Sequence, residues 1–368
     1  MGIYSELGVE PVINAAGTYT VLGGSRMSAE TIAAMAEAAQ DFVLIRDLQT
    51  KVHAEIARLT RNEAAYVSNG AATGLYLAVA AAVERLRGKR FYDITREEVV
   101  CCNVVMFRAH RNPYDLVIGH LGAQYREIAF PNIILPPTPD DLARAIDGNT
   151  AAVYFTTTSW VPPGFLPLET TISIAKKKGV PVIVDAAANL PPLENLWAFT
   201  EMGADAVLFS GGKDLCGPQA SGLMVGSKPF LDIVASIGFP NYGIGRMMKV
   251  GREEMIGLYS AVKQYVNMDH AARERWCEEQ IRMLSDGLAS HRRLRVERVY
   301  PNEAGQPIAR AFVELADSFG SAEDLRNYLL ANSPPIHAFS EGRQGVFINP
   351  MSLREGEMTV IIERLSAF

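Results

Sequence analysis

Cysteine is scarce in this sequence, and its few cysteines are not spaced as a metal or redox site. The 368 residues include four of them, at positions 101, 102, 216 and 277. None has the two-residue spacing of zinc ligands or of a redox thiol pair, and adjacent Cys101 and Cys102 are a poor disulfide candidate. We therefore expect no metal site and no disulfide framework. This cysteine usage fits a reducing, cytoplasmic location.

Long apolar segments are also missing. The first eleven residues, MGIYSELGVEP, contain no basic stretch followed by an apolar block, so they do not resemble a signal peptide. The alanine-rich run 71–83 is too short to cross a bilayer and is more typical of a buried helix. We expect no membrane partner.

An excess of positive charge is absent as well. Lysine and arginine total 35 against 41 acidic residues, for a net charge of −6. Non-specific attraction to nucleic acid is therefore not expected. The hydrophobic fraction of 48% and the charged fraction of 21% are ordinary for a globular chain with a sizeable core. The expected partner is a small molecule.

Apolar, strand-like segments alternate with helix-like segments over the first two thirds of the chain. The strand candidates are residues 64–67, 97–105, 151–159, 180–187 and 204–212. The helix candidates are residues 28–40, 47–60, 139–147, 169–179 and 194–202. Continuously apolar strands separated by helices predict an α/β fold with a mostly parallel sheet covered on both faces.

The alternation ends near residue 230, which indicates a second, smaller domain. A long helical region, 251–290, is followed by strand-like RVERVY, ARAFVEL and GVFINP and a helix near 321–331. This order predicts a small α+β C-terminal domain. We expect an N-terminal segment 1–45, a large domain 46–250 and the small domain 251–368.

A run of small residues follows the strand candidate 64–67. It consists of Ser68, Asn69, Gly70, Ala71 and Ala72, and it leads into the alanine-rich helix. Backbone N–H groups and the helix dipole at such a position suit a phosphate group. The run has neither the GxxxxGK[ST] nor the GxGxxG pattern, which excludes those two nucleotide sites. Taken alone, it is equally compatible with an ordinary strand-to-helix turn.

Two charged residues follow the next strand candidates. Asp185 ends VPVIVD, where a carboxylate could cap a helix or pair with a protonated heterocycle nitrogen. Lys213 comes one strand–helix–strand step later, after Ser210 and two glycines. A lysine on a loop is usually a surface residue. Here, however, the Ser210 hydroxyl can bind a phosphate, and the glycines let the backbone approach a cofactor.

The combination of these features predicts a pyridoxal 5′-phosphate site. In open parallel sheets, ligands bind beyond the carboxyl ends of the strands, where all three features occur. A phosphate-binding turn, an acid for the pyridine nitrogen and a lysine amine are the groups needed to hold this cofactor as a Schiff base. Lys213 would then also transfer protons once substrate displaces it.

Several segments resemble the bacterial selenocysteine-synthase-like family (L-seryl-tRNA selenium transferase-related) of fold-type-I pyridoxal phosphate enzymes, and in particular its D-glucosaminate-6-phosphate ammonia-lyase branch. The segments are INAAGTYTVLGGSRMS, AAYVSNGAATGL, RNPYD, VPPGFLPLETTISIAKKKGVPVIVDAAA, GADAVLFSGGKDLCGPQASG and MKVGREE. They cover most of residues 9–260. They are specific for fold and cofactor but not for substrate.

The resemblance implies roles for particular residues. Lys213 would carry the Schiff base, Asp185 would pair with the pyridine nitrogen, and residues 68–72 with Ser210 would hold the phosphate. His110 would stack on the ring, although a histidine hydrogen-bonded in the turn before Pro113 is an alternative. It further implies a homodimer or larger homo-oligomer with active sites at subunit interfaces.

Substrate contacts are expected from residues around the same site. The candidates are Arg246, Arg111, Tyr114 and Thr18. Arginine suits bidentate binding of carboxylate or phosphate, but Arg111 and Tyr114 could instead anchor their turn. The VINAAGT motif begins at residue 12, which leaves no room for an N-terminal tRNA-binding domain. We therefore expect an amino acid substrate and no nucleic acid.

The predicted function is a lyase that carries out α,β-elimination on a small, anionic hydroxy amino acid, such as one derived from a sugar, and releases ammonia when the enamine product hydrolyses. Lys213 would remove the Cα proton, after which the β-hydroxyl leaves. A racemase or an aminotransferase would use the same residues and is the main alternative. A cofactor-binding protein without activity is a third possibility, but it would not need the lysine, the acid and the phosphate turn together.

Overall fold

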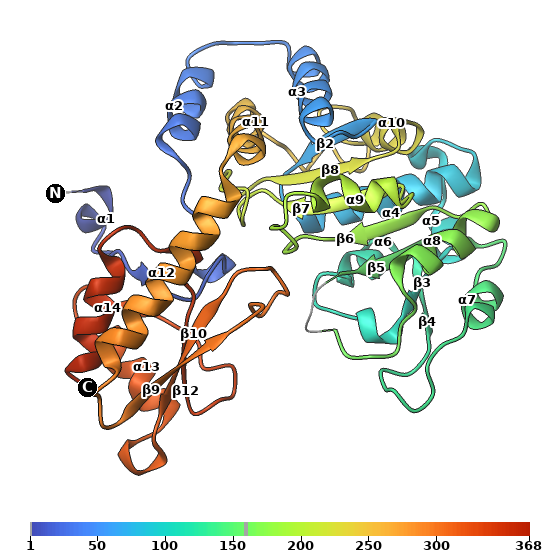
Figure 1. The fold of residues 1–368 in the computed structure, drawn as a ribbon. Helices are drawn as coiled ribbons and strands as arrows, with labels where there is room; N and C mark the ends of the chain where they lie inside the picture. Colours follow the sequence, from blue (N-terminus) through green and yellow to red (C-terminus); the bar gives the residue numbers. More distant parts are fainter. Residues whose placement is uncertain (1, 158–160) are drawn as a thin grey trace. The chain divides into compact units, whose positions relative to one another are not determined.

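The computed structural model describes residues 2–157 and 161–368 (Figure 1). It divides into two compact units. The small unit comprises the chain up to Arg26 and Asp269–Phe368, and the large unit comprises Met27–Met268. These boundaries differ from the expected 45/46 and 250/251, because the helix Arg252–Asn267 packs on Ala29–Ala38 and Ile45–Leu59 of the large unit.

The large unit is built on a seven-stranded sheet in the order β2-β8-β7-β6-β5-β3-β4. Its strands are β2 (Ala64–Ser68), β3 (Asn103–Phe107), β4 (Gln124–Ile128), β5 (Thr150–Thr156), β6 (Val182–Asp185), β7 (Ala206–Ser210) and β8 (Gly222–Gly226). Among these strands, β8 is antiparallel to both of its neighbours and the remaining pairs are parallel. The expected fold class, a mostly parallel α/β sheet with a smaller second unit, is confirmed.

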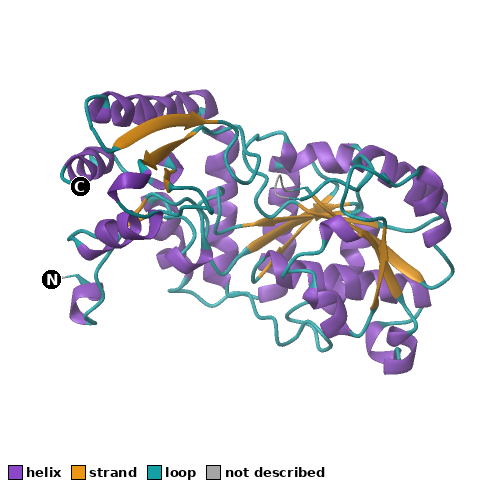
Figure 2. Ribbon diagram, turned by 90° about the horizontal axis from the view of Figure 1, so that it is seen from below, coloured by secondary structure: helices purple, strands orange, loops and turns teal. Residues whose placement is uncertain are grey.

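Helices cover both faces of this sheet (Figure 2). The helices of the large unit are α2 (Ala29–Ala38), which packs on α11, α3 (Ile45–Leu59), α4 (Ala71–Arg87), α5 (Arg96–Val100), α6 (Leu116–Leu121), α7 (Pro139–Ala145), α8 (Leu168–Lys177), α9 (Asn195–Glu201), α10 (Lys228–Ile237) and α11 (Arg252–Asn267). Alternate strand residues face opposite sides: Val153 and Val184 pack with α3, α8, α9 and α11, whereas Ala152 and Ile183 pack with α4, α6 and α10. Burial on both faces explains why the strands are apolar throughout.

Part of the expected strand 97–105 is a helix. Thr95 accepts a hydrogen bond from the Glu98 backbone, and the Glu98 side chain accepts one from the Thr95 backbone, so the two residues form a capping box that starts α5. The strand β3 begins only at Asn103. The strand expected over 151–159 ends at Thr156, and residues 158–160 lie outside the described part of the chain.

The small unit contains a three-stranded antiparallel sheet, in the order β12-β10-β9. Its elements are α1 (Ile3–Glu6), β1 (Ile13–Asn14), α12 (His270–Leu288), β9 (Leu294–Val299), β10 (Arg310–Leu315), α13 (Ala322–Ala331), β11 (Ile336–His337), β12 (Gly345–Ile348) and α14 (Glu357–Ser366). The short strands β1 and β11 pair in parallel. In the part of the chain that the structure describes, no helix is both long and apolar enough to span a membrane.

Candidate active site

The carboxyl ends of the parallel strands bring most of the predicted residues to one edge of the large unit. Ser68 ends β2, Asp185 ends β6 and Ser210 ends β7. Ser68 and Ser210 both pair with Gly222, the first residue of β8, one from each side. The two hydroxyl-bearing residues expected at the phosphate therefore flank the same glycine.

The turn 68–72 has the geometry of an anion-binding site. Helix α4 begins at Ala71, and its N-cap residue, Gly70, has φ 123° and supplies no side-chain cap. The first N–H groups of a helix have no partner within it, so they point at whatever lies beyond the end. The Oδ1 atom of Asn69 is buried without a hydrogen-bond partner in the described residues. A half-turn of the amide would present Nδ2, a donor, in its place.

Lys213 lies in a tight turn that follows Ser210. The Cys216 N–H donates to the Lys213 carbonyl oxygen at 3.0 Å, and the Gly211 N–H donates to the Ser221 carbonyl oxygen at 2.9 Å. A Cβ on Gly212 would lie 2.5 Å from the Cα of Gln219. The glycines before Lys213 therefore let the turn pack on its own following segment, a role that differs from the cofactor contact expected for them. The lysine itself is half-buried.

Asp185 is a buried carboxylate that lies within electrostatic reach of Lys213. Its side chain accepts hydrogen bonds from the Ala187 N–H at 3.1 Å and from the Tyr154 hydroxyl at 3.2 Å. Burial raises the pKa of the Asp185 carboxyl, whereas the Ala187 N–H, the positive charge of Lys213 and the Tyr154 hydroxyl lower that pKa. The acid and the amine predicted to share one cofactor thus lie near each other.

His110 lies beyond the end of β3 and is completely buried. Its ring packs against Phe155 and Phe165, with centroid separations of 4.3 and 4.8 Å. The Thr156 N–H points at Nδ1, 3.5 Å away, while Nε2 is buried without a partner in the described residues. Burial lowers the pKa of His110 to about 3, so the ring is neutral at pH 7. Stacking of this ring on a cofactor stays a prediction.

Arg111 and Tyr114 occupy the turn after His110. The Arg111 guanidinium forms ion pairs with the fully buried carboxylate of Asp115, at 2.8 Å, and with Glu127. Tyr114 is exposed, and its N–H donates to the Asn112 side chain at 2.9 Å. These contacts favour the alternative in which Arg111 anchors the turn.

The other two substrate candidates lie in different units. Arg246 is half-buried over the ring of Phe239, 5.5 Å from its centroid, and makes no ion pair within residues 2–157 and 161–368. Thr18 belongs to the small unit, in a turn where Asn14 Nδ2 donates to the Gly17 carbonyl oxygen at 2.8 Å. The structure does not relate Thr18 to the residues of the large unit.

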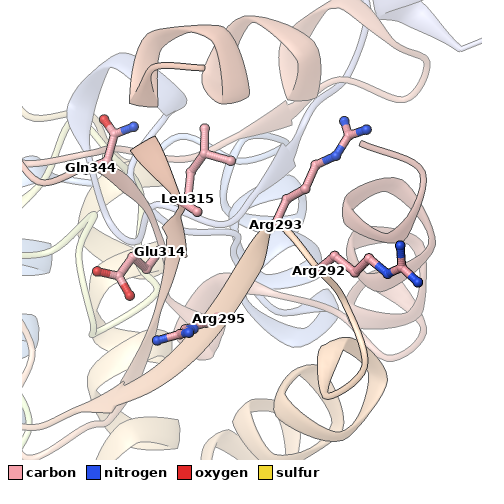
Figure 3. Close-up of a pocket in the computed structure, with 7 residues that line it drawn as sticks. Arg292, Arg293, Arg295, Glu314, Leu315 and Gln344 are labelled. Carbon is pink, nitrogen blue, oxygen red and sulfur yellow. The ribbon is translucent and has the colours of Figure 1, made fainter. Parts of the chain in front are cut away.

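A pocket of about 290 Å³ in the small unit is lined by arginines (Figure 3). Arg292, Arg293 and Arg295 contribute to it, and Glu314 supplies a carboxylate. Arg293 donates to the carbonyl oxygen of Phe368 at 2.8 Å. None of the residues predicted for catalysis or for cofactor binding lines this pocket.

Comparison with known proteins identifies the family. Residues 12–304 match the aminotransferase class-V family. The chain belongs to this family. Its members depend on pyridoxal phosphate, as the sequence predicted.

Two comparisons match this chain over nearly its whole length, and both concern an ammonia lyase. The chain is 32% identical to D-glucosaminate-6-phosphate ammonia lyase of Salmonella typhimurium, over 99% of this chain and 96% of that protein. A solved structure of D-glucosaminate-6-phosphate ammonia-lyase superposes with a TM-score of 0.83 at 29% identity, covering 100% of this chain and 98% of the other. This match confirms the fold-type-I architecture and the expected resemblance to the ammonia-lyase branch.

Two further relatives have other reactions in their names. A 5′-C-glycyluridine monooxygenase-decarboxylase of Streptomyces sp is 32% identical over 91% of this chain and 83% of that protein. The L-seryl-tRNA(Sec) selenium transferase of Moorella thermoacetica is 28% identical over 74% of this chain and 59% of that protein. The expected relationship to selenium transferases is confirmed.

Sequence reasoning missed three contributors to this edge of the sheet: Tyr154, Asn112 and Gly222. Tyr154 belongs to the strand-like AAVYFTTTS, where it resembles any other buried β residue. Gly222 opens a strand that was not expected, although the SGLMVG segment is apolar enough to have indicated one.

Proposed function

We propose that this class-V protein is a pyridoxal-phosphate-dependent lyase that releases ammonia from a small, anionic hydroxy amino acid. One observation carries the proposal: the buried Asp185 carboxylate lies close enough to Lys213 for the positive charge of the lysine to lower its pKa. At the same edge of the sheet, helix α4 begins at Ala71 without a side-chain N-cap. Relatedness over nearly the whole length to an ammonia lyase supports the reaction type.

The residues at this edge fit the cofactor. The Lys213 amine would bond the cofactor covalently, and Asp185 would accept a hydrogen bond from the protonated pyridine nitrogen. Ser68, Asn69, Gly70, Ala71 and Ala72, together with Ser210, would hold the phosphate through N–H and hydroxyl groups. When bound, the cofactor accepts the electron pair left at the substrate Cα.

Lys213 would act on the substrate as a proton carrier. Its amine takes the Cα proton, and the β-hydroxyl leaves with a proton as water. Because water is lost first and taken up again in hydrolysis, the net products are a 2-oxo acid and ammonia. Arg246, which forms no ion pair in the described part of the large unit, is the residue we expect to hold the anionic end of the substrate.

The identity of the reaction is tested by product analysis of the cofactor-loaded protein. We expect ammonia from at least one member of a panel of phosphorylated and unphosphorylated sugar-derived amino acids. Solvent deuterium at Cα without ammonia would instead indicate a racemase or an aminotransferase. Oxygen uptake with release of CO₂ would indicate a reaction like the one named for the Streptomyces relative. That relative and the ammonia lyase of Salmonella typhimurium are both 32% identical to this chain.

The role of Lys213 is tested separately from the reaction. Wild-type protein should show a visible absorption band with pyridoxal phosphate, and Lys213→Ala should lose both the band and the activity. Lys228→Ala is the matched control, since the Lys228 ammonium group is exposed and pairs with Asp232 at 2.8 Å. Retention of the band and of turnover by Lys213→Ala would contradict the proposal.

We further propose that the protein works as a homodimer or larger homo-oligomer. Several large apolar side chains of the large unit are exposed, including Phe42 at 98%, Leu44 at 74% and Tyr242 at 89%. Phe42 and Leu44 lie two residues apart in the chain, and large apolar side chains grouped on a surface are typical of interaction surfaces. Light scattering on the purified protein should give at least twice the monomer mass.

A further inference from the structure

A chain of hydrogen bonds leads from half-buried Asn112 through buried Tyr154 to buried Asp185. Asn112 Nδ2 donates to the Tyr154 hydroxyl at 3.0 Å, and that hydroxyl lies 3.2 Å from Asp185 Oδ2. The Tyr154 side chain has no exposed surface, and Asp185 is 8% exposed. Hydrogen bonds in such a dry setting are strong, and they are costly to leave unmade.

The direction of the Tyr154 hydrogen bond is determined by the contacts of Asn112. The Asn112 amide has one orientation that satisfies both of its backbone contacts. Nδ2 donates to the His110 carbonyl oxygen at 3.1 Å, and Oδ1 accepts from the Tyr114 N–H at 2.9 Å. Nδ2 can only donate, so the Tyr154 hydroxyl must accept from it. The single hydroxyl proton is left for Asp185.

Each carboxylate oxygen of Asp185 consequently receives one donor. Ala187 N–H donates to Oδ1 at 3.1 Å and Tyr154 donates to Oδ2. Donors directed at both oxygens favour the ionised carboxylate, as does the nearby charge of Lys213. Burial, followed by the negative charge of Asp185, raises the pKa of Tyr154 well above its ordinary value, so this donor stays protonated.

We propose that Tyr154 is a positioning residue that keeps Asp185 ionised and oriented, so that the proton shared with the cofactor sits on the pyridine nitrogen. This inference rests on the proposed function, since it requires that Asp185 accepts a hydrogen bond from the pyridine nitrogen of the cofactor. Asn112 acts through Tyr154: because its Nδ2 donates to the Tyr154 hydroxyl oxygen, the hydroxyl proton is directed toward the Asp185 carboxylate. Without the Tyr154 donor, the buried carboxylate is a stronger base, and the shared proton moves from the ring nitrogen toward Asp185.

The inference is tested by nitrogen NMR of the holoenzyme loaded with pyridoxal phosphate labelled with ¹⁵N in the ring. The wild-type ring signal should lie at the protonated position, and in Tyr154→Phe it should move toward the unprotonated position. Tyr66→Phe is the matched control, because Tyr66 is also buried in the large unit and makes no hydrogen bond to Asp185. Its ring signal should coincide with that of the wild type.

A second variant keeps the test decisive if Tyr154→Phe does not fold. Asn112→Ala removes the group that orients the hydroxyl and should shift the ring signal in the same direction by a smaller amount. An unchanged ring signal in Tyr154→Phe, or a shift in the Tyr66→Phe control as large as the one in Tyr154→Phe, overturns this inference and leaves the proposed function standing. A wild type that does not bind the cofactor, or that binds it with an unprotonated ring nitrogen, overturns the proposed Asp185 contact and the inference with it.

Discussion

A Cβ atom added to Gly222 would lie 2.4 Å from the backbone carbonyl carbon of Gly70. This glycine starts the antiparallel strand β8, and the turn before helix α4 lies directly on it. Contacts below 3 Å between carbon atoms cannot be accommodated without movement of the backbone. The shape of the candidate phosphate site therefore depends on the absence of a side chain on a neighbouring strand.

Gly222→Ala should disrupt cofactor binding more than it disrupts the fold. The added methyl group would push the turn around Gly70 outward, and a displacement near 1 Å at a functional site lowers activity by roughly 10²-fold. Overpacking should also lower the free energy of unfolding by about 1–3 kcal/mol. Titration with pyridoxal phosphate, turnover of the cofactor-loaded protein and urea unfolding of the cofactor-free protein measure these effects.

The matched control for this substitution is Gly148→Ala. A Cβ at Gly148 meets no atom within 4 Å. Its cofactor affinity and stability should equal those of the wild type. Equal affinity of the Gly222→Ala and Gly148→Ala proteins would refute the role assigned to the Gly222 contact.

Asp185→Asn should separate function from stability. Burial raises the pKa of Asp185, so the folded state binds its proton more readily than the unfolded chain, and ionisation costs stability as the pH rises. The neutral amide removes this cost but cannot hold the pyridine proton. We expect activity to fall by about 10²-fold or more, while the cofactor-free variant unfolds at no lower urea concentration than wild type at pH 8. A clearly less stable variant would argue that the acid is structural.

Arg111 and Arg246 should respond differently to the same substitution. Arg111→Gln leaves the buried Asp115 without its ion pair, which should lower the free energy of unfolding by about 3 kcal/mol. Arg246→Gln breaks no ion pair of the described residues and should raise KM with little loss of stability. Denaturation curves and steady-state kinetics on both variants distinguish the anchor from the substrate contact. Unchanged KM in Arg246→Gln would remove it from the substrate site.

His53 should make stability fall in mild acid. Its Nε2 accepts from the Val67 N–H at 3.1 Å, and burial lowers the pKa of His53 from 6.5 to about 4. The unfolded chain therefore takes up a proton before the folded one does, and stability is lost as the pH falls from 6.5 to 4. Between pH 7 and pH 5 this amounts to about 2 kcal/mol.

The pH dependence is measured by urea unfolding of the cofactor-free protein at both pH values. His53→Gln should lose less stability than wild type between pH 7 and pH 5, because its side chain does not titrate. His120→Gln, which changes an exposed histidine, should behave as wild type. A wild-type slope that survives in His53→Gln would assign the acid sensitivity to other groups, such as buried His110.

Much of the fold and the centre of the site could be predicted from the sequence, because they depend on local chemistry. Strands buried on both faces must be apolar throughout, so VPVIVD and ADAVLF indicated a covered parallel sheet. Polar residues directly after such strands are conspicuous, and parallel strands end at a common edge, which is why Ser68, Asp185 and Lys213 could be grouped before any coordinates.

Only the tertiary structure decided which side chains assist that group. Strand direction is set by the neighbours with which a strand pairs, so the sequence SGLMVG could not reveal that β8 runs antiparallel or that Gly222 lies between Ser68 and Ser210. Tyr154 reaches Asp185 because β5 and β6 are adjacent. Arg111 is held by Glu127 on β4, sixteen residues away. Composition and periodicity determine which residues are buried, whereas hydrogen bonds and ion pairs between distant segments depend on distances that only the folded chain establishes.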